Sequence, residues 1–308
     1  MAINTIQFAT LLQQKLDEQI TAHSTTGWME ANAGQVKYSG GKEIKVPGIT
    51  TSGLADYDRD SGFVQGVVNF GYETLTMSQD RGRTFVLDAM DVDETNFLMN
   101  ATAVAGEFQR TQVIPEIDAY RYSKLYAIAK SGNRVSTDYT PAKATMLDAL
   151  RADISAIRDE IGENTGLVIT LSEPAATILD SVSDISKHIS VTDFRQGNLN
   201  LKVKTLDEIP LRRVPSARMK SAYVFNDGST SGQTDGGFKT DASAVQINWI
   251  ICAQNAPVAV SKTDKLRIFA PDVNQSMDAW KIDYRKYHEL WVTKGKLPAI
   301  MVNAQPAT

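Results

Sequence analysis

The chain has 308 residues, of which 42% are hydrophobic and 22% are charged, a composition typical of a globular protein with one large domain or two. The net charge of −4 argues against a dedicated nucleic-acid-binding protein, and the one cysteine excludes a disulfide framework and a cysteine-based zinc site. No apolar stretch approaches the ~20 residues that span a bilayer, and the N-terminus lacks the pattern of a secretory signal. We therefore expect a protein that works in the cytosol, or in a particle assembled there, without a membrane partner.

The first ninety residues predict little compact structure. Residues 4–22 have apolar side chains at helical spacing and predict a short amphipathic helix. Residues 24–90 hold short strand-like runs, many turn residues and almost no helical pattern. Their clearest feature predicts a β-hairpin with strands at 72–77 and 84–87 and a turn at 78–83. Because a hairpin with so few apolar neighbours is marginally stable alone, we expect this segment to pack against another subunit.

The stretch 91–132 predicts one long helix, the spine. Asp91 or Asp93 can cap its start, Glu94 carries the charge that the helix dipole favours there, and Gly132 offers an end. Pro115 lacks an N–H donor and should kink or split the helix. The apolar positions recur at helical spacing, and we expect Phe108 and Leu125 among them to face a sheet. They are Phe97, Met99, Val104, Phe108, Val113, Ile117, Tyr120, Leu125 and Ile128.

After the spine the patterns of helix and strand alternate, which is typical of a sheet covered by helices. Thr140 followed by Pro141 predicts a helix that runs to about Gly162. Its expected buried stripe is Met146, Leu147, Leu150, Ile154, Ile157 and Ile161. A short buried strand is predicted at 167–171 and another helix at 172–179.

The last hundred residues predict mostly strands. Two strands joined by a turn are expected at 201–215, and the Gly, Ser, Thr and Asp of 226–243 predict a long flexible loop. Buried strands are expected at 245–253 and 256–260. The remaining segment predicts a long strand from Ala279, a turn at 294–298 and a closing strand.

Residue types that often carry catalysis occur in patterns that favour structural roles. The histidines His23, His188 and His288 stand far apart and none belongs to a paired metal-binding spacing. Residues 39–42 match the S-x-x-K motif of some hydrolases, but two glycines occupy its centre and the surrounding sequence is extended. Cys252 lies in an apolar run, which favours a buried, inert thiol.

Acidic clusters and the aromatic, basic C-terminal segment each leave an alternative open. Metal binding is possible for three acidic groups, but capping or solvation is favoured because no calcium-loop spacing is complete. These groups are Asp56, Asp58 and Asp60; Asp88, Asp91, Asp93 and Glu94; and Asp227 with Asp235. The segment with Trp280, Lys281, Tyr284, Arg285, Lys286 and Tyr287 is compatible with single-strand nucleic-acid binding. A half-buried strand is favoured, with Trp280, Ile282 and Tyr284 on one face and Lys281, Asp283 and Arg285 on the other. We therefore predict no catalytic, cofactor-binding or metal-binding residues.

The order of these elements resembles the major capsid proteins of tailed bacteriophages, which have the Hong Kong 97 type of fold also found in encapsulin shells. Three segments are similar to those of long-tailed phages of Gram-positive bacteria. They are NATAVAGEFQRTQVIPEIDAYRYSKLY, VKTLDEIPLRRVPSARM and DAWKIDYRKYHELWV.

The resemblance implies an α+β capsid fold with an N-terminal arm, an extended hairpin loop, a long spine helix, a peripheral domain and an axial domain. The implied segments are 1–30 for the N-terminal arm, 31–90 for the extended loop, 91–135 for the spine and peripheral domain, 136–257 for the axial domain, and 258–308 for returning peripheral strands. Residues 226–243 would then lie near the fivefold and sixfold axes. The family's long N-terminal scaffolding segment has no counterpart, so a separate scaffolding protein is expected. Some relatives crosslink a lysine to an asparagine between subunits, but nothing in the sequence shows that Lys42 or Lys45 reacts.

The function implied by the resemblance is structural, with no enzyme activity and no cofactor. Copies would assemble as hexamers and pentamers into an icosahedral head that encloses double-stranded DNA without sequence-specific binding. A portal would be a further partner, and the virion, assembled in the host cytoplasm, would be the location. The alternatives are an encapsulin-like compartment shell and a cytosolic hydrolase that uses one of the acidic clusters.

Overall fold

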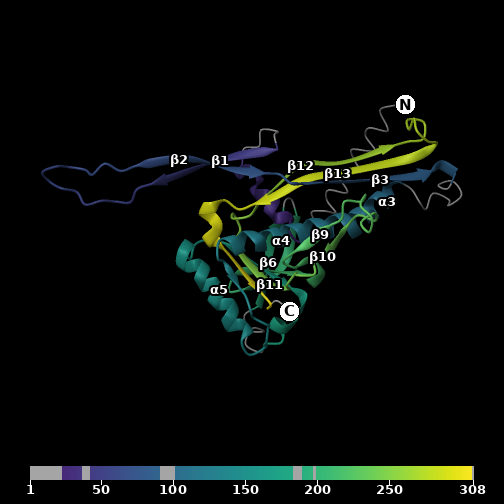
Figure 1. The fold of residues 1–308 in the computed structure, drawn as a ribbon. Coiled ribbons are helices and arrows are strands. Elements are labelled where there is room, and N and C mark those ends of the chain that lie inside the picture. Colours follow the sequence, from purple (N-terminus) through teal and green to yellow (C-terminus); the bar gives the residue numbers. More distant parts are fainter. Residues whose placement is uncertain (1–22, 37–41, 91–100, 183–188, 197–198, 307–308) are drawn as a thin grey trace.

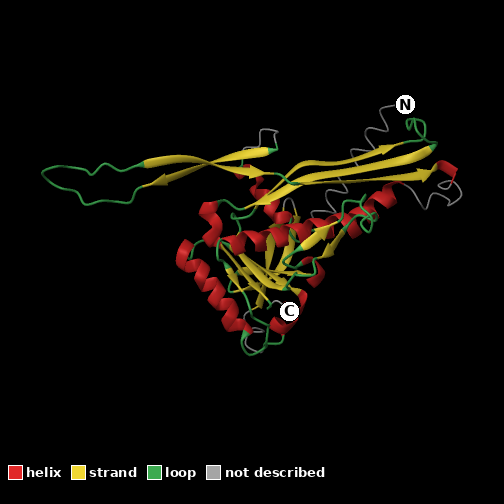
Figure 2. Cartoon of the chain, viewed as in Figure 1, coloured by secondary structure: helices red, strands yellow, loops and turns green. Residues whose placement is uncertain are grey.

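The computed structural model describes residues 23–36, 42–90, 101–182, 189–196 and 199–306. Three parts are distinct in Figure 1: a two-stranded arm that projects to one side, a long three-stranded sheet that lies along the spine, and a tapering body built on a larger sheet. Figure 2 shows that the arm has no helix along its strands, whereas the body is flanked by helices. The predicted helix at 4–22 lies outside the described residues.

The described residues contain eight helical elements, three of which form the spine. They are η1 (Gly27–Gln35), α3 (Ala101–Phe108), η2 (Gln109–Val113), α4 (Ile114–Ser131), α5 (Met146–Ile161), α6 (Glu173–Asp180), η4 (Ser216–Arg218) and η5 (Lys294–Ala299). The 3₁₀ helix η1 falls in a stretch whose sequence predicts extended chain.

The strands form four sheets. They are β1 (Glu43–Thr51), β2 (Val68–Thr76), β3 (Gln79–Asp88), β4 (Val135–Ser136), β5 (Leu167–Ser172), β6 (Ile189–Gln196), β7 (Leu199–Leu206), β8 (Ile209–Val214), β9 (Tyr223–Phe225), β10 (Phe238–Thr240), β11 (Ile247–Ala253), β12 (Val258–Phe269), β13 (Ala279–Trp291) and β14 (Ile300–Ala304). Strands β1 and β2 form the arm, β9 and β10 a small hairpin, and β12, β13 and β3 the long sheet in that order. The body sheet has seven strands in the order β4-β14-β11-β5-β8-β7-β6.

The spine runs through α3, η2 and α4 and ends at Ser131, with Gly132 as its C-cap, as predicted. Pro115 lies in the first turn of α4, directly after the five-residue π-helical segment η2. A proline cannot supply the N–H that continues the normal helical ladder, and a π-bulge is one way to accommodate the lost bond. Pro115 therefore changes the winding of the helix locally and does not split it, because the backbone at Val113 and Ile114 stays helical. The predicted caps Asp91 and Asp93 lie outside the described residues.

The predicted hairpin between 72–77 and 84–87 is wrong. Strand β2 pairs with β1, from Glu43 opposite Thr76 to Thr51 opposite Val68, and β3 pairs with β13. The chain passes from one sheet to the other at Ser78, whose N–H and hydroxyl both donate to the buried carboxylate of Glu289. The predicted turn at 78–83 is strand, because long-range pairing with β13 holds it extended.

Gly82 shows why β13 lies so close to β3. A Cβ atom at this position would lie 2.8 Å from the carbonyl oxygen of Tyr284, closer than real Cβ contacts. The glycine that marks a turn in the sequence therefore serves a close approach between two strands.

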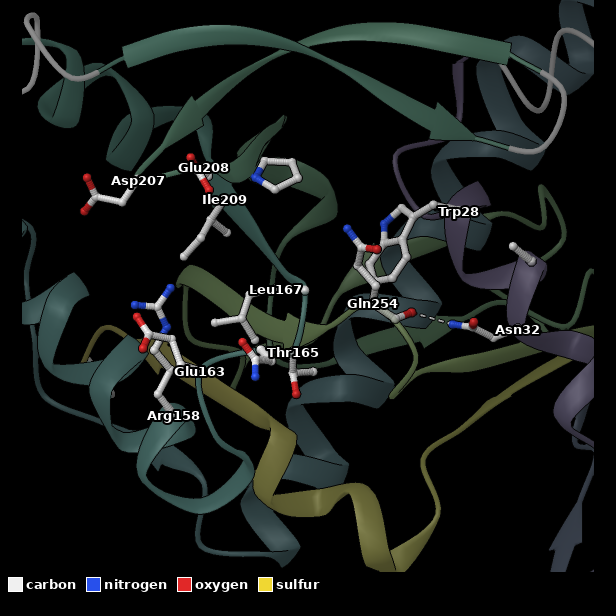
Figure 3. Close-up of a pocket in the computed structure, with 14 residues that line it drawn as sticks. Trp28, Asn32, Arg158, Glu163, Thr165, Leu167, Asp207, Glu208, Ile209 and Gln254 are labelled. Atoms are coloured by element: carbon white, nitrogen blue, oxygen red, sulfur yellow. Dashed lines mark hydrogen bonds between the residues drawn. The ribbon is translucent and has the colours of Figure 1, made fainter.

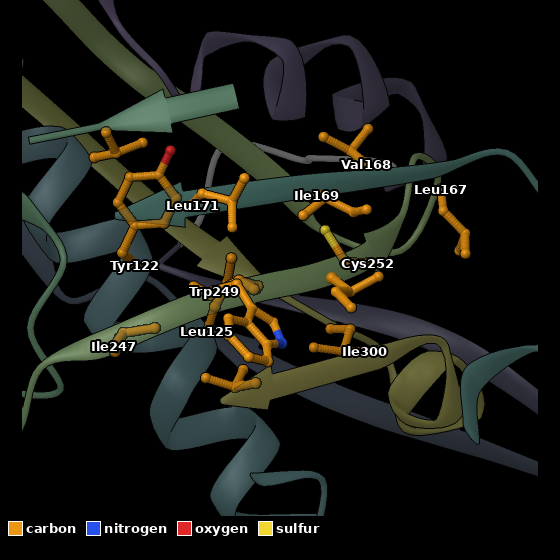
Figure 4. Close-up of a cluster of buried hydrophobic side chains, with 14 of the residues drawn as sticks. Tyr122, Leu125, Leu167, Val168, Ile169, Leu171, Ile247, Trp249, Cys252 and Ile300 are labelled. Atoms are coloured by element: carbon orange, nitrogen blue, oxygen red, sulfur yellow. The ribbon is translucent and has the colours of Figure 1, made fainter. Parts of the chain in front are cut away.

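The core of the body lies between α4 and the seven-stranded sheet. Figure 4 shows Tyr122 and Leu125 of the spine among side chains of the sheet, including Trp249 and Ile300, in one hydrophobic cluster. Strands β5 and β11 are central in the sheet and are buried along their whole length because side chains from the flanking helices cover the sheet. The buried strands predicted at 167–171 and 245–253 are thus confirmed.

Helix α5 begins later than predicted, at Met146, and ends at Ile161 as expected. Residues around Pro141 are not helical because tertiary contacts hold Tyr139 just before it. The Tyr139 carbonyl accepts a hydrogen bond from Asn248, and its ring lies edge-on to Trp249 at 5.5 Å.

The segment 226–243 is more ordered than its composition predicts. It contains β10, which pairs with β9 through Phe238 opposite Phe225. The guanidinium of Arg81 donates to the carbonyls of Asn226 and Gly237, so β3 also holds both ends of this loop. The prediction of one long loop is wrong at Phe238–Thr240, which form β10.

Strand β13 has the predicted alternation. Ile282 and Tyr284 are buried against the spine, whereas Arg285 is exposed on the opposite face. The closing strand β14 does not stay with β12 and β13 but lies beside β11 in the seven-stranded sheet.

Candidate assembly surfaces

The arm formed by β1 and β2, with the loop that joins them, carries large apolar side chains that no described residue covers. Phe63 is 90% exposed, Phe70 is 75% exposed and Tyr72 is 73% exposed. The other exposed apolar side chains of the arm are Ile49, Leu54, Tyr57, Val64, Val67 and Val68. Contiguous exposed apolar surface of this kind marks an interaction site in a folded protein.

Only the root of the arm is packed. Ile44 and Leu75 are buried there with Met77 in a small cluster that also holds Val258 and Trp291. The rest of the arm extends beyond the sheet that anchors it (Figure 1). The root fixes the direction of the arm, and the exposed part is left for a partner.

The arm tip, residues 56–63, has its own turn structure. Asp58 and Gly62 form a backbone bridge, and the Asp58 carboxylate accepts hydrogen bonds from the Asp60 N–H at 2.9 Å and the Ser61 hydroxyl at 2.7 Å. These bonds lower the pKa of Asp58 because they favour its charged form. The rings of Tyr57 and Phe63 meet edge to face at 4.8 Å. The tip is therefore shaped before it meets a partner.

A buried carboxylate ties the start of the described chain to the spine. Asp118 has no exposed surface and accepts hydrogen bonds from the Ser24 hydroxyl at 2.9 Å, the Thr25 N–H at 3.0 Å and the Thr26 N–H at 3.1 Å. Arg121, three residues after Asp118 on the same helix, forms an ion pair with Glu30. The segment before η1 is thereby fixed on the spine.

Glu289 fulfils a similar structural role where the arm meets the long sheet. Its buried carboxylate accepts bonds from Ser78, from the Tyr120 hydroxyl at 2.5 Å and from the Leu290 N–H at 3.1 Å. Burial, together with the charge of Glu289, raises the pKa of Tyr120. A carboxylate with all of these donors is held as a crosslink and is not presented to a substrate.

His288 and Cys252 are buried, and His23 lies at the surface. His288 is 4% exposed and its ring lies edge-on to Tyr120. Burial, and then the positive charges of Arg121, Lys286 and Arg81, lower the pKa of His288 well below its usual value. His23 is exposed, and His188 lies outside the described residues. Cys252 is buried, and burial raises the pKa of its thiol to about 12, so the thiol stays protonated.

Several acidic residues of the predicted clusters serve as caps. Asp88 accepts a hydrogen bond from the Met90 N–H, and Asp227 accepts bonds from the N–H groups of Ser229 and Thr230. Asp91, Asp93 and Glu94 lie outside the described residues, as do the first three residues of the S-x-x-K match at 39–42. Across the part of the chain that the structure describes, no three His, Cys, Asp or Glu side chains gather in a way that could hold a metal ion.

One cavity, of about 620 Å³, lies between η1 and the edge of the body (Figure 3). Trp28 and Asn32 of η1 line it on one side, and Arg158 and Glu163 line it on the other. The Asn32 side chain donates to the Gln254 carbonyl at 2.6 Å and closes one end. Asp207 and Glu208 also line it, so its lining is largely polar.

A second cavity, which we name the spine cavity, has a volume of about 580 Å³ and lies between β3, the η2–α4 part of the spine and residues 226–238. Its lining combines aromatic side chains with Arg81, Arg83 and His288. Sequence reasoning missed this cavity because its walls are separated by more than a hundred residues. The one signal was the pair of arginines that flank Gly82 on β3.

The chain was compared with known protein families, sequences and solved structures. No protein-family model and no curated protein sequence matches the chain. Solved structures do match, among them a chain of Mycobacterium phage Che8 with 14% identity, which covers 85% of this chain and 84% of the other at a TM-score of 0.55. The mature capsid of bacteriophage PhiM1 matches with 12% identity, over 86% and 82% of the two chains, at a TM-score of 0.58. The chain has the fold of phage capsid proteins. The capsid of cyanophage P-SCSP1u agrees, with 9% identity, 89% and 86% coverage and a TM-score of 0.58.

The match to phage capsid structures confirms the predicted α+β class. At sequence identities of 9–14%, these matches show the fold and nothing more specific. Within that fold, the exposed arm and the spine cavity are the surfaces of this chain that its own packing leaves incomplete. No helix among the described residues is long and apolar enough to cross a membrane.

Proposed function

We propose that this chain is a major capsid protein whose copies assemble as hexamers and pentamers into an icosahedral head around double-stranded DNA. One observation carries the proposal: in a chain with the phage capsid fold, the arm displays large apolar side chains that no described residue of the same subunit covers. A neighbouring copy would supply that surface.

The physics of the arm favours a ring. The arm is unlike any surface of the body, so a contact between the arm of one copy and the body of the next is heterologous, and such contacts form a ring when the rotation between copies closes. Aromatic side chains bury about 150–250 Å² each, so Tyr57, Phe63, Phe70 and Tyr72 alone account for a substantial part of an obligate interface. Leaving them in water would instead favour aggregation.

The other assignments of the proposal concern partners and domain roles. A separate scaffolding protein and a portal would take part in assembly, and the shell would belong to a virion assembled in the host cytoplasm. The axial role would fall to 136–257 and the peripheral role to 91–135 and 258–308, with 31–90 as the extended loop and 1–30 as the N-terminal arm. A position of 226–243 near the symmetry axes stays a prediction.

The test is to express the chain and view it by negative-stain electron microscopy, with light scattering on the same sample. We expect closed shells or uniform rings. A monodisperse monomer at high concentration, with or without hydrolase activity, would contradict the proposal. Particles that exclude nucleic acid and enclose a cargo enzyme in the native host would instead identify a compartment shell of the encapsulin kind.

A further inference from the structure

The spine cavity has the size and the lining of a small-molecule site. Its volume of about 580 Å³ lies within the usual range of ligand pockets. Four aromatic side chains from four different elements line it: Phe85, Phe108, Phe238 and Tyr284. Phe108 lies edge-on to Phe85 at 4.8 Å and to Tyr284 at 5.9 Å, so these three rings form one aromatic wall. Such a wall favours a planar aromatic group in the cavity.

Two polar side chains in the lining each have an atom without a partner. His288 is only 4% exposed, and its Nδ1 atom makes no hydrogen bond to any described residue. The side-chain amide of Asn226 donates to the Gly236 carbonyl at 2.9 Å, but its Oδ1 atom accepts no bond from any described residue. Buried polar atoms in folded proteins are nearly always hydrogen-bonded, and one without a partner costs free energy. The pair therefore indicates a ligand that brings a hydroxyl or an N–H group into the cavity.

Arg83 supplies the lining with a cation that has no carboxylate partner among the described residues. Its guanidinium donates to the Thr234 carbonyl, at a long 3.4 Å. Gly228 and Gly236, both at positive φ, leave room for it, because Cβ atoms there would lie 3.0 Å and 3.3 Å from its Nη1. Arg83 is thus held beside the aromatic wall and is available to an anionic group.

Most of the acidic side chains in the lining are already engaged. Asp80 and Glu116 each form an ion pair with an arginine, and Asp227 accepts hydrogen bonds from the N–H groups of its own loop. Asp235 is the remaining carboxylate of the lining, and it is exposed to water. Because water and salt screen an exposed charge, Asp235 weakens the attraction of Arg83 for an anion without cancelling it.

We propose that the spine cavity of a single subunit binds a small planar aromatic molecule that carries both a hydrogen-bond donor and an anionic group. Its rings lie against the aromatic wall, its donor reaches Asn226 or His288, and its anionic group lies at Arg83. The ligand contacts β3, the spine and β10 together, so it stabilises the junction between the long sheet and the body. The site is complete within one subunit and goes beyond the structural role proposed above.

The probe that tests the site is 6-hydroxynaphthalene-2-sulfonate, which combines two fused rings, a hydroxyl donor and an anion. Its binding to the full chain is measured by isothermal titration calorimetry. Two matched probes each lack one feature: naphthalene-2-sulfonate has no hydroxyl, and 2-naphthol has no anion. We expect saturable binding of one probe molecule per subunit and a rise in melting temperature, with both matched probes weaker by about fivefold or more.

Substitutions place the binding in the cavity. Arg83→Gln should weaken the sulfonate probe by about tenfold and leave 2-naphthol unchanged, since only the anion uses the guanidinium. Asp235→Asn should strengthen the sulfonate probe by about two- to fivefold, because it removes the opposing charge. The matched control is Arg267→Gln, which removes an exposed arginine of the same sheet outside the cavity and should change nothing. Phe70→Ala in the exposed arm should also change nothing.

Thiol protection gives a second readout that does not depend on affinity alone. Gln112→Cys places a thiol in the lining, and the native thiol of Cys252 is buried. The probe should slow alkylation of the new thiol by about tenfold at saturation and should leave a thiol at Asp272→Cys unprotected.

No saturable binding to the unmodified chain, equal losses from Arg83→Gln and Arg267→Gln, or binding that is lost with Phe70→Ala would each overturn the site. These outcomes are separate from assembly. A chain that forms shells but binds no probe contradicts the site alone, and a chain that binds the probe but forms no shells contradicts only the proposed capsid role.

Discussion

The arm and the seven-stranded sheet contain the same kinds of side chain in opposite environments. Trp249 and Ile251 of the sheet have no exposed surface, whereas Phe70 and Tyr72 of the arm are about three-quarters exposed. The difference lies in what covers them. Strand β11 has a strand on each edge and helices over it, while among the described strands β1 and β2 pair only with each other and are covered only at the root. Apolar residues in the sheet therefore stabilise the subunit, and those in the arm can stabilise only an association.

The largest expected effect follows from removing the exposed part of the arm. We predict that replacing residues 49–70 with an Asn-Gly turn, which joins Gly48 to its partner Gly71, abolishes shells and leaves a folded subunit. The buried root at Ile44 and Leu75 stays intact, so the melting temperature should change by a few degrees at most. Light scattering and a melting curve on one sample check both halves. Intact shells, or an unfolded chain, would show that the two regions are not separable in this way.

A core substitution should have the opposite signature. Leu125→Ala should lower the free energy of unfolding by about 2–5 kcal/mol, because it opens a cavity at a fully buried site. Phe70→Ala in the arm is the matched control and should change the unfolding of unassembled subunits by less than about 0.5 kcal/mol. Urea denaturation of both variants measures the contrast. Similar losses would mean that the arm packs on its own subunit in solution.

Phe108 is intermediate in burial between Leu125 of the core and Phe70 of the arm. It is only partly buried, between Phe85 and Tyr284, so Phe108→Ala should cost less than the Leu125 change, about 1–3 kcal/mol. Glu107→Ala next to it removes an exposed ion pair with Arg110 and should cost under about 0.5 kcal/mol. Hydrogen exchange or urea unfolding distinguishes the two. Equal costs would place the wrong face of the spine against the sheet.

The smallest effect concerns pH. The pKa of His288 is lowered in the folded protein, so below about pH 6.5 the unfolded chain binds the extra proton and the free energy of unfolding falls as pH falls. One such group contributes about 0.8 kcal/mol of lost stability at pH 6, and the slope approaches about 1.4 kcal/mol per pH unit below that. His288→Gln should flatten the dependence between pH 6.5 and pH 5 relative to the unmodified chain. Parallel curves for the two proteins would show that His288 keeps its usual pKa.

The sequence by itself determined the elements whose signals are local. The end of the spine at Gly132, the end of α5 at Gly162, and the strand and helix at 167–180 all lie where glycine, proline and apolar spacing place them. The alternation along the first half of β13 also indicated that Ile282 and Tyr284 are buried and that Arg285 is exposed. The order of these elements was enough to predict the fold, since the capsid resemblance depends on that order.

Only the tertiary structure decided the pairing of strands and what each surface lacks. Strand β3 could pair with β2 in a hairpin or with β13, about two hundred residues later in the chain. The pairing with β13 depends on Glu289, which binds Ser78 between the two sheets, and on the close packing at Gly82. Neither contact leaves a local pattern in the sequence. The same holds for the spine cavity, whose walls meet only after folding. Apolar residues in the arm look like core residues in sequence, because spacing records which side chains share a face and not whether anything covers that face.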